Sequence, residues 1–143
     1  MQRRQFATAL GLLPLAGAAF AAEPPRIRMF ELYNEDKDRT FSPAARKLAG
    51  KAVTVQGFMA PHLKVDSDFF VLSNQPVETC PFCASEDQWI DTIIFVRMKK
   101  RQQAANPGDL ILVEGKLEIG PQTDALTGFT SRVRLVDATF RVL

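Results

Sequence analysis

Residues 107–119 read PGDLILVEGKLEI, a tight turn followed by a long apolar stretch with a glycine in it. The turn begins at Asn106 and ends at Asp109, because Asn, Pro, Gly and Asp in succession are strong turn formers. Apolar and polar residues then alternate, which is the pattern of a β-strand with one buried face. Gly115 interrupts this alternation and predicts a bulge or bend in the strand.

The same period of two recurs on both sides of this stretch, so the chain is predicted to be mainly β. Ser42 followed by proline is a typical helix start, and Gly50 is a natural helix stop, so a short helix is expected over residues 44–49. Residues 23–33 are expected to enter as an extended segment. The last strand should kink near Asp137. The predicted strands are 53–58, 69–72, 92–98, 110–119 and 131–143.

Two glycine-spaced strands carry a resemblance to a known fold. The pattern Gly-Lys-x-Val-x-Val-x-Gly at 50–57 and the pattern Pro-Gly-Asp-x-Ile-x-Val-x-Gly at 107–115 resemble oligonucleotide/oligosaccharide-binding (OB) barrels. The resemblance implies a small five-stranded Greek-key barrel over residues 48–143, with one or two short helices. A β-sandwich is the structural alternative. Because the OB fold hosts many activities, the resemblance does not specify a function.

The first residues read as an export signal. Gln2 to Phe6 (QRRQF) resembles the core of the twin-arginine signal, and Ala19-Phe20-Ala21 is a small-x-small cleavage site. The alternative is an ordinary secretory leader with two chance arginines. We therefore predict a signal peptide at 1–21, an N-terminal extension at 22–47, and a soluble periplasmic barrel at 48–143. The twin-arginine resemblance implies folding, and often metal loading, before export.

Charge argues against nucleic acid as a partner. The chain has 18 Lys and Arg against 16 Asp and Glu, and the predicted leader contains two of the arginines, so the mature domain is formally neutral. A neutral domain has no overall attraction for nucleic acid or anionic membranes. The basic run at 97–101 is most simply a solvated loop. No second apolar stretch of about twenty residues follows the leader, so no membrane span is expected after cleavage.

Cys80-Pro81-Phe82-Cys83 is the one place where the sequence concentrates chemistry. Two cysteines two residues apart can hold a zinc or copper ion, because thiolates are soft ligands. The pair also has the form of a glutaredoxin-type active site, although too few residues follow it for the long helix of that fold. A third interpretation is a structural disulfide that stiffens a loop in an oxidising compartment. All three interpretations remain open on the sequence.

His62 is the sole histidine and the outlying candidate for a third metal ligand, with carboxylates or water completing the site. Gly57-Phe58-Met59-x-Pro61, ahead of a cysteine-bearing loop, resembles small uncharacterised exported bacterial proteins. Four phenylalanines, at positions 58, 69, 70 and 95, form either a stacking face or part of the core, and alternation favours the core for at least some of them.

The leading hypothesis is a periplasmic accessory protein that binds a transition metal through Cys80, Cys83 and His62. It would deliver metal to a transporter or metalloenzyme, or buffer it, with a metal-handling protein as partner. The first alternative is a thiol–disulfide redox protein that uses the cysteine pair. The second is an OB-type partner- or ligand-binding module with a structural disulfide. No arrangement of residues typical of an enzyme is recognisable.

Overall fold

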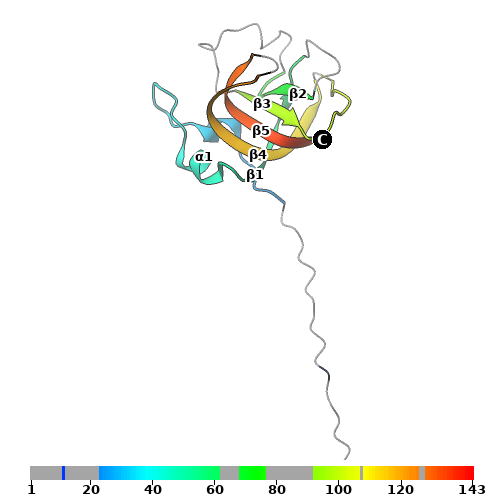
Figure 1. Cartoon of the computed structure of the whole chain (residues 1–143), viewed down its shortest axis with the longest axis horizontal. Coiled ribbons are helices and arrows are strands. Elements are labelled where there is room, and N and C mark those ends of the chain that lie inside the picture. The colour runs from blue at the N-terminus through cyan, green and yellow to red at the C-terminus, as the bar shows by residue number, and fades with distance from the viewer. Residues whose placement is uncertain (1–10, 12–22, 62–67, 77–91, 107, 126–127) are drawn as a thin grey trace, which may run out of the picture.

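A computed structural model describes residues 11, 23–61, 68–76, 92–106, 108–125 and 128–143. Within these ranges, one mixed sheet of five strands closes into a barrel (Figure 1). The ring order is β1-β2-β3-β5-β4; the β3–β5 pair is parallel and the other pairs are antiparallel. The mainly β, five-stranded prediction is confirmed, and a closed ring takes the place of the two sheets of a sandwich. The strands are β1 (Ala52–Met59), β2 (Phe69–Ser73), β3 (Ile93–Met98), β4 (Leu110–Thr123) and β5 (Thr130–Val142).

The barrel interior is filled by alternate side chains of every strand, as the sequence period predicts. Val53 and Val55 of β1 and Val113 of β4 are fully buried, and Phe70 of β2 joins them. The residues between them point outward. The outer face is not exposed throughout, because Val71 of β2 and Ile93 of β3 form a second buried apolar cluster there with Ala60.

Two predicted irregularities let long strands bend around the narrow barrel. The β4–β5 register shifts between Glu114 and Lys116, which places a bulge at Gly115. A side chain at Gly115 would approach Ala138 and the Val136 carbonyl to about 3.1 Å, so only glycine fits without displacing β5. Asp137 has a positive φ of 50°, and the kink expected in the last strand occurs there. Figure 1 shows β4 and β5 as the long curved strands of the wall.

The segment before β1 is part of the barrel core. The extended segment predicted for 23–33 is wrong in its second half, where a 3₁₀ helix, η1 (Met29–Leu32), turns Met29 and Leu32 into the core. Burial of these apolar side chains explains the turn, because an extended chain would direct alternate ones to solvent. The short helix α1 (Pro43–Leu48) forms as predicted, with the Ser42 hydroxyl accepting the Ala45 N–H at 3.1 Å.

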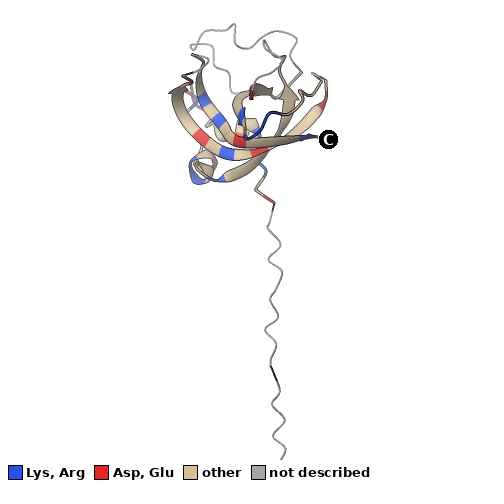
Figure 2. Ribbon diagram, turned by 45° about the vertical axis from the view of Figure 1, so that its right-hand side comes forward, with Lys and Arg blue, Asp and Glu red and all other residues tan. Residues whose placement is uncertain are grey.

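Charges of both signs lie along the same strands. In the view of Figure 2, Lys and Arg segments are interspersed with Asp and Glu segments on the barrel wall. None of the helices in the described ranges is long and apolar enough to cross a bilayer.

Candidate functional site

The three metal ligands predicted from the sequence, Cys80, Cys83 and His62, lie outside the described residues. Chain order places both cysteines in the connection between β2 and β3, and His62 in the connection between β1 and β2. Within the described ranges, no three His, Cys, Asp or Glu side chains form a group that could hold a metal ion.

The base of the cysteine-bearing connection is held by the sheet itself. Beyond the last register pair of β2 and β3, the Asn74 N–H donates to the Thr92 carbonyl at 2.8 Å. This hydrogen bond, the next one after the β2–β3 pairing, therefore fixes the two ends of the connection. The described part of the β1–β2 connection ends at Asp68, at the opposite end of β2.

The outer face near that opposite end carries a ladder of three aromatic rings. Phe69 of β2 stacks on Phe95 of β3, and Phe95 stacks on Phe129, with both pairs of ring centroids 5.6 Å apart. Phe129 precedes β5, so the ladder joins three segments of the chain. Phe95 is 2% exposed although it points away from the barrel interior, which shows how closely this outer face is covered.

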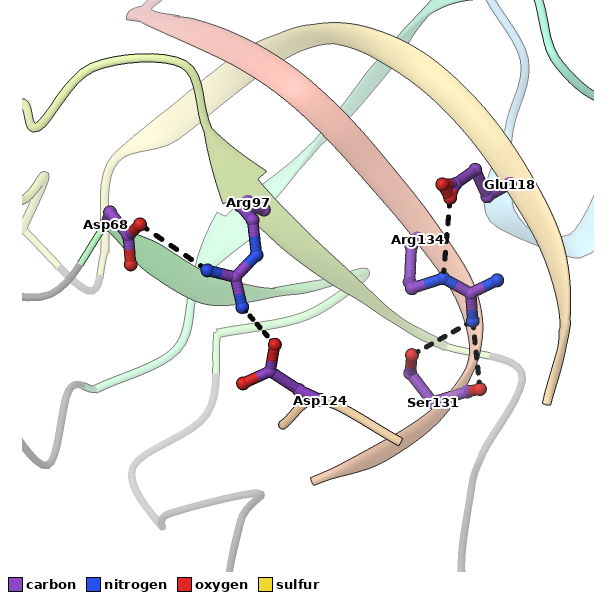
Figure 3. Close-up of polar contacts among 6 residues, drawn as sticks. All are labelled: Asp68, Arg97, Glu118, Asp124, Ser131 and Arg134. Carbon is purple, nitrogen blue, oxygen red and sulfur yellow. Dashed lines mark hydrogen bonds and ion pairs between the residues drawn. The ribbon is translucent and has the colours of Figure 1, made fainter. Parts of the chain in front are cut away.

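Arg97 extends the ladder into a charged cluster. Its guanidinium lies 5.7 Å from the Phe95 ring centroid, a cation–π distance, and 3.4 Å from a carboxylate oxygen of Asp68. A second guanidinium nitrogen donates to Asp124 at the end of β4 (Figure 3). The predicted strand 92–98 includes Arg97, and β3 extends through it; the interpretation of the basic run at 97–101 as a solvated loop is wrong for Arg97, which lies beside two carboxylates.

Arg134 is the most deeply buried charge in the described chain, at 7% exposure. One of its guanidinium nitrogens, Nη1, donates to the Gly120 carbonyl at 2.8 Å and to the carbonyl and hydroxyl of Ser131 at 3.1 and 3.2 Å. Its Nε has no hydrogen-bond partner and lies 3.9 Å from the Glu118 carboxylate (Figure 3). Burial lowers the pKa of Arg134, and the Glu118 charge partly opposes this shift.

The two arginines border a polar pocket of about 160 Å³, together with Glu118 and Asp124. Sites for small-molecule ligands usually enclose about 300–1,000 Å³, so this pocket suits a few waters rather than an organic ligand. The guanidinium groups of Arg97 and Arg134 that border it already contact carboxylates and carbonyl oxygens. We therefore interpret the cluster as an anchor that holds the β4–β5 hairpin against β2 and β3.

Sequence reasoning did not single out Arg134. Its position in the alternating run at 131–136 indicated an outward-facing side chain, but the carbonyl that it reaches belongs to Gly120, fourteen residues earlier in the chain. Only the β4–β5 pairing brings these groups together.

In the described residues, these features define a five-stranded β-barrel with a polar cluster on its wall, in which Arg134 Nε alone of the buried side-chain polar atoms has no hydrogen-bond partner. No protein-family model matches the sequence, and no curated protein matches it. A solved structure of a DUF3299 family protein from Pseudomonas aeruginosa is similar, with a TM-score of 0.52 and 13% sequence identity. The match covers 84% of this chain and 96% of that chain. At this identity the likeness bears on the fold alone.

Proposed function

We propose that this chain is an exported, periplasmic OB-type barrel that binds a transition metal through Cys80 and Cys83. The finer fold assignment is supported by the ring order β1-β2-β3-β5-β4 and by the parallel closure between β3 and β5. Five strands with a non-sequential closing pair are consistent with a Greek-key barrel. The proposed role is to deliver zinc or copper to a transporter or metalloenzyme, or to buffer it.

The observation that carries the proposal is the anchored base of the cysteine-bearing connection. The Asn74–Thr92 hydrogen bond holds both ends of a segment that contains two thiols separated by two residues. Two thiolates are sufficient ligands for copper(I), and zinc needs two further ligands from protein or water. A site with open positions suits transfer of the ion better than permanent structure.

His62 is a separable part of this proposal. The connection that carries it enters β2 at Phe69, whereas the cysteine-bearing connection leaves β2 at Ser73. Five residues of strand separate the two ends by about 13 Å, at roughly 3.3 Å per residue. A two-thiolate site therefore does not depend on His62, and the histidine needs its own variant.

The test is native mass spectrometry of mature protein purified from periplasm without chelator. We expect one bound metal ion in the wild type and in a Ser85→Ala control, and none in the Cys80→Ser, Cys83→Ser double variant. His62→Ala should weaken metal retention only if the histidine is a ligand. A metal-free protein two protons lighter than its reduced form would refute the proposal and favour a disulfide, whose reduction potential then separates redox work from a structural role.

A further inference from the structure

A groove of about 420 Å³ opens where β1 changes its neighbour in the barrel wall. In its first half, β1 pairs with the N-terminal segment: the Thr54 N–H donates to Pro25 and the Thr54 carbonyl accepts from Ile27, both at 3.0 Å. At its far end, β1 pairs with β2 through Phe58 and Ser73. The groove lies between these two pairings, and its volume is within the range of ligand sites.

Gln56 presents an unused backbone edge to this groove. It lies two residues from Thr54 and two from Phe58, so its N–H and carbonyl point to the same side of β1 as theirs. The backbone of Gln56 has no hydrogen-bonded partner on that side among the described residues. One backbone donor and one backbone acceptor of Gln56 thus face the groove. An extended chain added at a strand edge pairs with groups of this kind.

The groove is basic and partly aromatic. Among the described residues, Arg26 contacts the neutral Gln56 side chain at 3.4 Å. Arg28 contacts the Glu31 carboxylate at 3.9 Å, an exposed pairing of the kind that contributes little, and its guanidinium lies over the Phe30 ring at 5.5 Å from the centroid. Phe30 is 63% exposed, which is high for a ring. No Asp or Glu is among the described lining residues: Arg26, Ile27, Arg28, Met29, Phe30, Gln56, Gly57, Phe58, Asn74 and Leu110.

We propose that this groove binds an extended acidic segment of a partner protein. The partner backbone pairs with Gln56, its carboxylates lie against Arg26 and Arg28, and an apolar side chain packs on Phe30. A peptide fits better than a nucleic acid, because the Gln56 donor and acceptor match a peptide backbone and the mature domain is neutral overall.

The groove also borders the base of the cysteine-bearing connection, because Asn74 lines it. A partner bound here would therefore be held beside that connection. The binding proposal does not rest on metal binding, and the two can fail independently.

The test is a ¹⁵N–¹H NMR titration of the mature protein with a blocked eight-residue peptide of alternating glutamate and valine. We expect the Gln56 amide and the Asn74 side-chain amide to shift. Loss of two exposed charge pairs predicts about tenfold weaker binding in the Arg26→Gln, Arg28→Gln variant. The matched control, Arg46→Gln with Lys47→Gln on α1, removes the same charge elsewhere and should bind within about twofold of wild type.

Three results would overturn the proposal. One is equal weakening by the α1 control, which would mean non-specific attraction. Another is equally tight binding of a lysine–valine peptide. The last is no shift at Gln56 at millimolar peptide. Phe30→Ala provides a second variant with little risk to folding, because this ring is largely exposed. It should weaken binding, and in the free protein it should shift only resonances close to residue 30, such as those of Arg28.

Discussion

Replacement of Gly57 by alanine should open the seam between β1 and β2. An added Cβ would lie 2.6 Å from the Ser73 carbonyl oxygen and 3.1 Å from the Leu72 side chain. The nearer atom belongs to the backbone, so β1 and β2 must separate by several tenths of an ångström. In the described chain this seam is short: Phe58 with Ser73 and Met59 with Leu72 are in register, and one hydrogen bond follows from the Ala60 N–H to the Val71 carbonyl at 2.9 Å.

The cost follows from overpacking and from weakened hydrogen bonds. Overpacking a tight site costs about 1–3 kcal/mol, and each weakened backbone bond adds up to about 1 kcal/mol. We expect Gly57→Ala to lower the free energy of unfolding by about 3 kcal/mol and the Tm by about 10 °C. Urea unfolding measures the loss, and hydrogen exchange should rise first at the amides of Phe58 and Ala60.

Gly50→Ala is the matched control. Gly50 has a φ of +80° and nothing within 4 Å of the added carbon, so the same substitution there costs backbone strain alone, about 1 kcal/mol. If Gly57→Ala costs no more than Gly50→Ala, or if exchange at Phe58 is unchanged, the steric reasoning about the seam is refuted.

Two further predictions concern the charged groups. Arg134→Leu should lower the free energy of unfolding by about 3 kcal/mol, because buried carbonyls lose their donor. Glu118→Gln should lower it by less than about 1 kcal/mol, because its contact is long and partly exposed. Equal losses of the two variants in urea unfolding would contradict this reasoning. Hydrogen bonds from the Thr40 side chain and backbone lower the pKa of Asp36 below its ordinary value of 3.8. The stability from this depressed pKa is present above the unfolded pKa and is lost as pH falls through the folded one. In acid-unfolding curves, wild type and Thr40→Val should therefore differ most above the ordinary pKa of 3.8, and the difference should shrink as pH falls below it.

Local sequence determined the elements of this protein. Alternation specified the inward-facing valines of β1 and β4, Ser42 specified the start of α1, and Gly115 and Asp137 specified where strands bend. Each of these depends on the residue itself or on neighbours a few positions away. The 3₁₀ helix at Met29–Leu32 was the exception, because its turn depends on burial against a barrel whose strands all come later in the sequence.

Tertiary structure alone decided which groups meet. Arg97 contacts Asp68 and Asp124, each more than 25 residues away. The backbone N–H and carbonyl of Gln56 have no partner among the described residues, because β1 changes neighbours on either side of it. No local pattern encodes such contacts, since they depend on the order in which strands close the ring. The cysteine pair is the converse case: the sequence alone singled it out as a candidate site, and the fold adds the anchored base of the connection that carries it.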